Sequence, residues 1–195
     1  SYSPNGIIGE KDACGVGFVA NVEGIESNWI LKQSLKGLNC MEHRGGCGGD
    51  SDSGDGAGIL CSIPWGYLEE KINLKNTQEF NRGLGMVFMP NKKEKIEICK
   101  SICDEEAEKL KVNKTSWRTV PVNNEILGPL AKANAPFICQ WILYIDKKDH
   151  KDVERLLFQL RKRIEKKIRE TFKNDVGDCE FYFASLSSQT VVYKG

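Results

Sequence analysis

The sequence has no apolar run that could cross a membrane. The longest runs, such as Phe137 to Ile145 with Gln140 inside it, are far shorter than the roughly 20 residues needed. The chain does not open with the basic, apolar and small-residue pattern of a secretory signal. Its 28 Lys and Arg nearly balance 27 Asp and Glu, so no net field attracts polyanions. We therefore expect a globular protein with no nucleic-acid partner and no membrane.

Motifs for nucleotides and metals are also missing. The glycine-rich segment 44–58 contains neither G-x-G-x-x-G nor G-x-x-x-x-G-K-[ST]. If Asp50 began an EF-hand loop, the twelfth position would be Cys61 instead of glutamate. No standard zinc spacing is met by the neighbouring thiols and imidazole, which are Cys40, His43, Cys47 and Cys61. We predict no metal site, and no cofactor bound by residues 1–195.

The eight cysteines do not have the spacing of a secreted disulfide module. In a chain of 195 residues without a secretion signal, reduced and mostly buried thiols are the better interpretation. Cys99 and Cys103, four residues apart, are expected to face the core from one helix. This interpretation leaves room for a single reactive cysteine.

Apolar periodicity predicts an α/β or α+β layered domain. A domain that ended at Gly195 would leave its last strands uncovered, so we expect the polypeptide to continue. Strands are expected at 14–22, 59–63, 83–89, 117–122 and 137–145, and a hairpin at 181–186 and 190–193. Helices are expected at 27–43, capped by Ser27, and at 66–72, 92–110, 125–133 and 149–172.

The last of these helices lies in a strongly basic segment. Residues 147–173 carry 11 Lys and Arg against 5 acidic residues. Nucleic acid or acidic lipid could bind such a helix, but its apolar stripe requires a protein core to pack against. An ordinary exposed helix face is therefore the favoured interpretation. His150, among charged neighbours, is expected to be a solvated residue at the start of this helix.

Cys14 is the candidate nucleophile. An ordinary thiol has a pKa of about 8.5, so Cys14 needs a base to become a thiolate at neutral pH. The sequence offers only two histidines. A second source of a base is the α-amine of Cys14 itself, which cleavage after Ala13 would release. A buried strand thiol without chemistry is the alternative, and the residues alone leave both open.

Three segments resemble the start of glutamate synthases, especially the ferredoxin-dependent cyanobacterial and plastid type. They are CGVGFVANVEG from Cys14, CMEHRGGCGGDSDSGDGAGIL from Cys40 and IPWGYL from Ile63, and the later FYFASLSSQTVVYKG is similar too. The resemblance implies an α+β fold, the N-terminal-nucleophile hydrolase four-layer αββα sandwich, incomplete at its C-terminus. It implies that residues 1–13 are a leader and that 14–195 are the N-terminal part of a glutamine amidotransferase domain.

The resemblance also implies the roles of three site residues. Cys14 is the catalytic nucleophile, and Arg44 and Gly45 help to wall the glutamine pocket. Taken without the family, Arg44 is a loop arginine at the surface. The Asn-Gly pair of the family's oxyanion hole lies downstream of these residues, as do the groups that bind the α-carboxylate and α-amine of glutamine. We therefore expect the 195-residue piece to be inactive by itself.

The implied activity is release of ammonia from L-glutamine for reductive amination of 2-oxoglutarate. By resemblance, the full-length enzyme carries FMN and a 3Fe-4S cluster in its downstream domains and takes electrons from ferredoxin. It is expected in the cytoplasm or the plastid stroma. Two alternatives stay open at this point: an amidotransferase with another ammonia acceptor, and a silent structural fragment.

Overall fold

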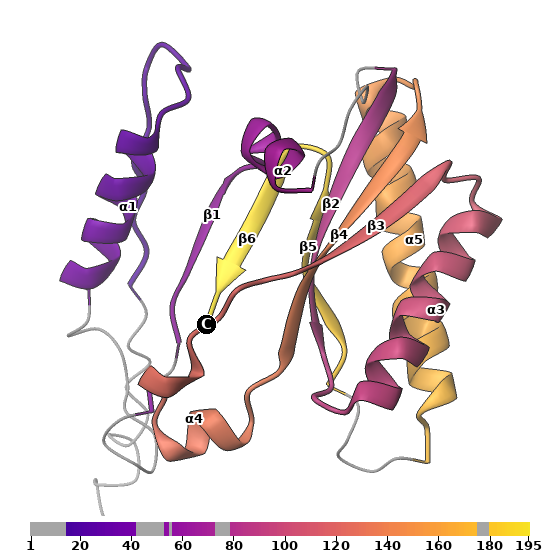
Figure 1. The fold of residues 1–195 in the computed structure, drawn as a ribbon. Coiled ribbons are helices and arrows are strands. Elements are labelled where there is room, and N and C mark those ends of the chain that lie inside the picture. Colours follow the sequence, from indigo (N-terminus) through magenta and orange to yellow (C-terminus); the bar gives the residue numbers. More distant parts are fainter. Residues whose placement is uncertain (1–14, 42–52, 55, 73–78, 175–179) are drawn as a thin grey trace, which may run out of the picture. The chain divides into compact units, whose positions relative to one another are not determined.

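A computed structural model of the chain describes residues 15–41, 53–54, 56–72, 79–174 and 180–195 (Figure 1). The chain divides into two compact units. The smaller unit contains residues 1–59, 127–133 and 195, and the larger unit contains residues 60–126 and 134–194.

The larger unit is built on a four-stranded sheet of order β3-β4-β2-β5, in which all neighbours are antiparallel. Its two central strands are mostly apolar and buried, as expected for strands that are covered on both faces. β3 is an edge strand. The bounds are β2 Phe80–Met89, β3 Lys114–Thr119, β4 Phe137–Asp146 and β5 Tyr182–Ser187.

One residue of β5 has no partner on β2. Val87 pairs with Phe183 and Met86 pairs with Ser185, so the intervening Ala184 forms a bulge. The bulge shifts the alternation of side chains by one position. Phe183 and Leu186 therefore both pack with the same core cluster, although they are three residues apart.

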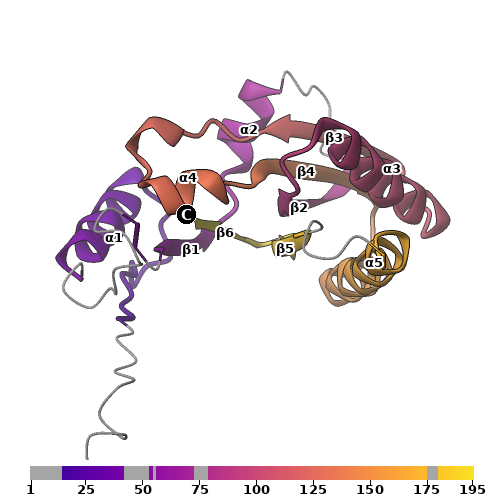
Figure 2. The same ribbon diagram turned by 90° about the horizontal axis from the view of Figure 1, so that it is seen from below.

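Two helices, α3 (Lys93–Lys109) and α5 (His150–Thr171), cover one face of this sheet (Figures 1 and 2). Six apolar side chains of α5 recur at helical spacing and are all buried. They pack on Trp141, Leu143 and Ile145 of β4. The six are Val153, Leu156, Leu157, Leu160, Ile164 and Ile168.

A single carboxylate connects α3 to the sheet. Asp104 accepts hydrogen bonds from Thr115 Oγ1 at 2.8 Å, from Trp117 Nε1 at 3.0 Å and from Trp141 Nε1 at 3.0 Å. The two indole rings belong to residues paired across β3 and β4, and they stack with centroids 5.3 Å apart. Asp104 thus satisfies donors from two strands at once.

The opposite face of the sheet has its own apolar cluster. Ile63, Leu68 of α2 (Trp65–Lys71) and Val191 of β6 (Thr190–Lys194) pack there on side chains of β2 and β4. β6 also pairs with β1 (Gly58–Ser62), of which residues 60–62 belong to the larger unit. The described residues thus form a mixed α+β fold with two sheets.

The smaller unit contains α1 (Asn28–Cys40) and the short α4 (Pro129–Ala133). Ser27 caps α1, because its Oγ accepts a hydrogen bond from the amide of Ile30 at 3.4 Å. This cap confirms the expectation from the sequence. The amphipathic helix nevertheless buries none of its residues among those that the structure describes.

The predicted strand at 14–22 is wrong for the residues that are described, because residues 15–22 form no strand. Val16 and Phe18 are 89% and 94% exposed. A strand needs a partner to take up its backbone hydrogen bonds, and no described strand pairs with this segment. The apolar, β-branched composition of this segment predicted a strand, but composition alone does not provide a strand to pair with.

Two other boundaries differ because of proline. The helix predicted at 125–133 is a 3₁₀ turn at Asn124–Ile126 followed by α4, since Pro129 starts a helix readily but cannot continue one. β3 ends at Thr119, before Pro121, and starts three residues earlier than the predicted 117. The other predicted helices and strands of the larger unit are confirmed within a few residues.

Glu106 gives the larger unit a specific dependence on pH. Its buried carboxylate accepts hydrogen bonds from Lys109 Nζ at 2.6 Å and from Arg163 Nε at 2.7 Å. The bond from Lys109 lowers the pKa of Glu106 most, burial opposes this, and Arg163 lowers it further. The contribution to stability is therefore complete above the unfolded pKa of about 4.3 and is lost as pH falls through the lower folded value.

We expect the Glu106→Gln variant to be less stable than the parent at pH 7, with the difference shrinking below about pH 4.3. Urea unfolding of both proteins between about pH 7 and pH 3 measures this difference. Glu97→Gln, at an exposed position of the same helix, is the matched control and should change little. A difference for Glu106→Gln that stays constant down to pH 3 would contradict the assignment.

Candidate functional site

Part of the glycine-rich segment is described, at Ser53–Gly54 and Gly56–Gly58, all in the smaller unit. Ser53 is buried, and its Oγ accepts a hydrogen bond from the amide of Ala131 at 3.1 Å. This bond fixes the segment against α4. The amide and carbonyl of Ala57 bond to the carbonyl and amide of Gly195, at 3.1 and 3.0 Å.

Gly56 is required at its position for two reasons. Its φ of +89° is outside the range that side-chain-bearing residues adopt readily. A Cβ at this position would also collide with the carbonyl oxygen of Gly195. Gly56 and Ala57 thus approach the backbone of Gly195 closely.

Three thiols in the larger unit are poor nucleophiles because they are partly or fully buried. Burial raises the pKa of Cys61, of Cys103 and of Cys139, the last to about 12. The Cys139 thiol lies 3.9 Å from the Met89 sulfur, as a weak donor. These three cysteines stay protonated at neutral pH, which makes them structural residues.

A buried polar cluster lies on the face of the sheet opposite α3 and α5. Arg118 Nη1 donates to the side-chain oxygen of Gln140 at 2.8 Å, and the Gln140 amide nitrogen lies 3.3 Å from the Tyr193 hydroxyl. Burial raises the pKa of Tyr193, and its hydrogen bond to Gln140 opposes the rise. Gln140 interrupts the apolar strand in the sequence, and this network is its physical reason.

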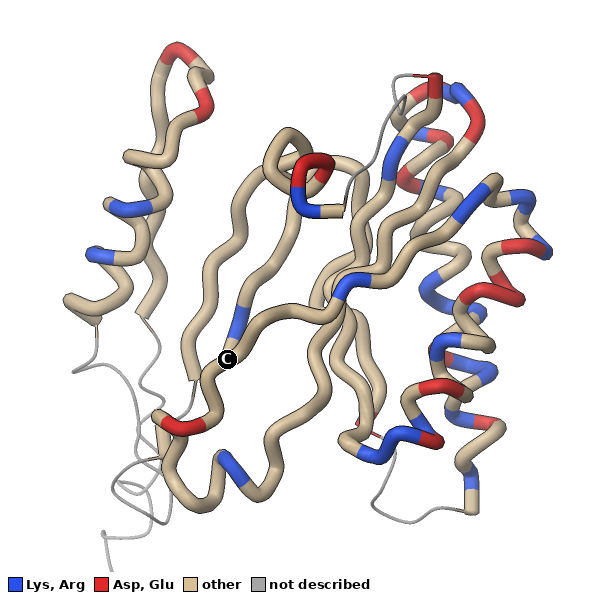
Figure 3. The backbone as a smooth tube through the Cα atoms, in the orientation of Figure 1, with Lys and Arg blue, Asp and Glu red and all other residues tan. Residues whose placement is uncertain are grey.

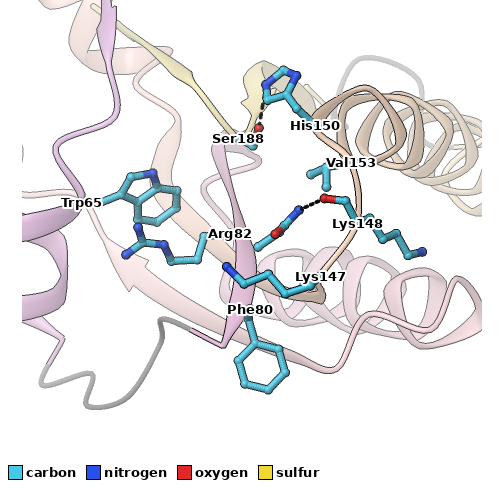
Figure 4. A pocket seen from close by; sticks show the side chains of 9 residues that line it. Trp65, Phe80, Arg82, Lys147, Lys148, His150, Val153 and Ser188 are labelled. Atoms are coloured by element: carbon cyan, nitrogen blue, oxygen red, sulfur yellow. Dashed lines mark hydrogen bonds between the residues drawn. The ribbon is translucent and has the colours of Figure 1, made fainter.

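A pocket of about 370 Å³ lies in the larger unit (Figure 4). Arg82 forms an ion pair with Glu69 and lies 4.6 Å from the centroid of the Trp65 ring, and burial lowers its pKa. Asn81 Nδ2 donates a hydrogen bond to the Lys148 carbonyl at 2.8 Å.

On the other side of this pocket, His150 Nε2 lies 3.4 Å from Ser188 Oγ, and Ser188 donates to Glu154 at 2.6 Å. His150 begins α5 and is exposed, as predicted. Because the Ser188 proton is already bonded to a carboxylate, this arrangement is a helix-to-hairpin link and no activated nucleophile. Sequence periodicity gave no sign of the pocket, because its residues come from four separate segments of the chain.

The described part of the chain has neither a metal-binding cluster nor a membrane-spanning helix. No three His, Cys, Asp or Glu side chains there are grouped so that they could hold a metal ion. None of the described helices has the length and apolarity needed to span a bilayer.

Comparison with known protein families identifies the family of this chain. The family described as class-II glutamine amidotransferases matches residues 14–195. The chain belongs to the class-II glutamine amidotransferases. The match starts at Cys14 and extends to the last residue of the sequence.

Curated relatives of this amidotransferase chain are ferredoxin-dependent glutamate synthases. The chain is 41% identical over 193 residues to synthase 1, chloroplastic/mitochondrial, of Arabidopsis thaliana. It is 42% identical over 195 residues to the chloroplastic enzyme of Oryza sativa, and 40% identical over 193 residues to synthase 2 of Synechocystis sp.. These alignments cover 97%, 98% and 97% of this chain but only 12% of each relative.

The comparisons confirm the resemblance inferred from the sequence, to a glutamine amidotransferase region of glutamate synthases. They do not assign the residues of its site. Cys14, Arg44 and Gly45 lie outside the described residues, so their geometry stays a matter of prediction. The described residues nearest to them in sequence are Gly15, Met41 and Ser53.

Proposed function

We propose that this amidotransferase chain is the glutaminase portion of a glutamate synthase, with Cys14 as its nucleophile. The observation that carries the proposal is the family match, which begins at Cys14 and covers residues 14–195. The raised pKa values of Cys61, Cys103 and Cys139 support it, because each of these thiols is a poor nucleophile.

The chemistry uses a freed α-amine. Removal of residues 1–13, the proposed leader, leaves Cys14 as the first residue, and its amine takes the thiol proton. The thiolate attacks the side-chain amide carbon of L-glutamine to give a tetrahedral intermediate. The amine returns the proton to the leaving nitrogen, so ammonia departs and a thioester remains. Water then attacks the thioester, releases glutamate and restores the thiol.

Two further residues are proposed to shape the pocket. Arg44 can orient a carboxylate or carbonyl through its planar guanidinium, and Gly45 leaves room for close approach. Residues 14–195 are then the N-terminal part of the domain, in a four-layer αββα sandwich. The covered sheet of the larger unit, with α3 and α5 on one face, supports two of those layers.

In the complete polypeptide we place reductive amination of 2-oxoglutarate, with FMN, a 3Fe-4S cluster and ferredoxin as its redox partners. The names of the relatives support the electron donor. By family resemblance we assign the iron–sulfur cluster to downstream domains of the complete polypeptide. We place the complete enzyme in the cytoplasm or the plastid stroma, and the word chloroplastic in the names of two relatives supports the plastid.

The test compares residues 1–195 with a form that starts at Cys14, each treated with a diazoketone analogue of glutamine. We expect intact mass spectrometry to show one adduct on Cys14 of the shorter form only. Cys14→Ser in the shorter form should abolish the adduct. Neither form should turn over glutamine, because losing one oxyanion donor alone costs roughly 10²–10³ in rate.

The remaining outcomes separate the alternatives. Labelling of Cys14 with residues 1–13 still attached would show that the α-amine is not required. Absence of labelling in both forms, and also in the complete polypeptide that holds the glutamine-binding groups, would favour a silent structural fragment. An amidotransferase with a different ammonia acceptor would label as proposed, but the complete polypeptide would then not convert 2-oxoglutarate to glutamate.

A further inference from the structure

The outward face of α3 is acidic. Its buried side chains, from Ile96 to Ala107, point to the sheet, and the positions opposite them are exposed. Within α3, which the structure describes in full, these outward positions carry no Lys or Arg. One of them, Ile98, is an apolar residue that is 43% exposed. The set is Glu94, Glu97, Ile98, Ser101, Glu105 and Glu108.

The outward face of α5 is basic. Seven exposed positions recur every three or four residues, on the side of the helix opposite its buried stripe. All seven lie in α5 or in the two residues after it, a segment that the structure describes in full, and none of them is acidic. In the middle of them, Phe158 is 61% exposed. The set is Lys151, Arg155, Phe158, Lys162, Lys166, Arg169 and Lys173.

The two helices lie side by side and run in opposite directions. Lys95, near the start of α3, lies 5.7 Å from the ring of Phe172 at the end of α5. Further along α3, Glu106 bonds to Arg163, which comes earlier in α5. The acidic outward residues of α3 therefore lie at the same heights along the helix axes as the basic outward residues of α5. Glu94, for example, is level with Lys173. Figure 3 shows the charged residues on both helices.

From this pattern we propose that the α3–α5 face pairs with the same face of a second copy of the chain. A two-fold axis parallel to the helices, lying between the two faces, places α3 of each copy over α5 of the other. The acidic row of each copy then meets the basic row of the other copy. The same contact is therefore made twice, as an isologous interface requires. An axis perpendicular to the helices would instead place acid on acid and base on base.

The heights of the charges fit this axis. Glu105 and Glu108 of one copy meet Lys162 and Lys166 of the other, and the exposed Ile98 and Phe158 add apolar contact within the charged rows. Pairs of Lys162 with Glu165 and of Lys166 with Glu170 within α5 are 3.7 and 3.9 Å long and exposed. Such loose surface pairs compete weakly with a partner.

A second copy fits better than a polyanion does. Nucleic acid would satisfy the basic row but would meet the acidic row beside it. The face is also modest in size, because helices of 17 and 22 residues are about 25 and 33 Å long and about 10 Å wide. That is at the low end for a specific interface, so the dimer is weak and sensitive to salt.

The test uses sedimentation velocity of the 195-residue chain at about 20 mM and about 500 mM salt, where the Debye length falls from roughly 20 to roughly 4 Å. We expect a concentration-dependent shift from 21.9 kDa towards twice that mass at low salt only. Two variants, Glu105→Lys/Glu108→Lys and Lys162→Glu/Lys166→Glu, should each weaken self-association at least about tenfold, because like charges then face each other.

Mixing the two variants provides the decisive arm. The lysine-bearing α3 of one variant faces the glutamate-bearing α5 of the other, so an equimolar mixture should associate although neither variant does so alone. The control Lys71→Glu/Lys114→Glu makes the same change in net charge as Lys162→Glu/Lys166→Glu, but at positions away from this face. It should self-associate like the parent. Circular dichroism checks that all four proteins are folded.

Three results would overturn the proposal. They are a parent that stays monomeric at low salt, single-sided variants that still dimerise, and a mixture that does not associate. A monomeric parent that binds heparin through Lys162 and Lys166 would assign the basic row to an acidic partner instead.

Discussion

Replacing Asp104 by alanine is expected to lower the free energy of unfolding by about 3–5 kcal/mol. The change leaves the indole N–H of the fully buried Trp141 and that of Trp117 without their acceptor. Each buried donor left unsatisfied costs about 1–3 kcal/mol, and Thr115 loses its bond as well. Urea unfolding followed by tryptophan fluorescence measures the loss.

Two control variants make this result specific. Asp104→Asn keeps one acceptor oxygen and should lose less stability than Asp104→Ala. Asp152→Ala removes an exposed carboxylate that pairs with Arg155 on α5, and should change stability by less than about 1 kcal/mol. Equal losses for Asp104→Ala and Asp152→Ala would show that the indoles do not depend on this acceptor.

The second large effect concerns Leu157 and Gly83. Leu157→Ala should cost about 2–5 kcal/mol, because it opens a cavity under α5. Gly83→Ala should cost about 1–3 kcal/mol for the opposite reason, since its Cβ would lie 3.0 Å from Leu157 Cδ2. The same urea titration measures both.

The double variant Gly83→Ala/Leu157→Ala tests whether the two effects share one space. The new Cβ no longer meets the leucine and fills part of the cavity, so the combined loss should be smaller than the sum by about 0.5–3 kcal/mol. Leu160→Ala, buried one turn away, provides the control, and its pairing with Gly83→Ala should be closer to additive. Additive losses for the first pair would contradict the contact.

Much of the larger unit could be predicted from the sequence, because its signals are local. The stripe from Val153 to Ile168 marks a helix face at 3.6-residue spacing, and each of its six apolar residues is buried. The run from Phe137 to Asp146 marks a central strand for the same kind of reason. Cys99 and Cys103 also face the core, as their spacing predicted.

Features that depend on several elements could not be predicted. The bulge at Ala184 is set by its partner β2, and nothing in the run FYFASLS shows where the extra residue lies. Asp104 gains its role only because β3 and β4 place Trp117 opposite Trp141. The pocket around Arg82 is likewise assembled from separate segments.

For the candidate site, sequence motifs were more informative than hydrophobic periodicity. Periodicity alone would have left Cys14 as a strand thiol, and it did predict a strand that residues 15–22 do not form. The motif resemblance, in contrast, identified the family that the match over 14–195 confirms. The roles that we propose for Arg44 and Gly45 rest on motifs, because neither hydrophobic pattern nor charge distinguishes a pocket residue from a loop residue.

The edge position of β3 has a consequence for how the protein behaves in concentrated solution. An unpaired strand edge is a template on which another chain can add, and apolar edges lead to aggregation. β3 carries Lys114 and Arg118 and ends just before Pro121, which has no amide hydrogen to continue a ladder. The apolar β2 and β4 are kept in the interior of the sheet. The strand order thus protects β4 by placing a charged, proline-terminated strand outside it, while β5 covers the other side of β2.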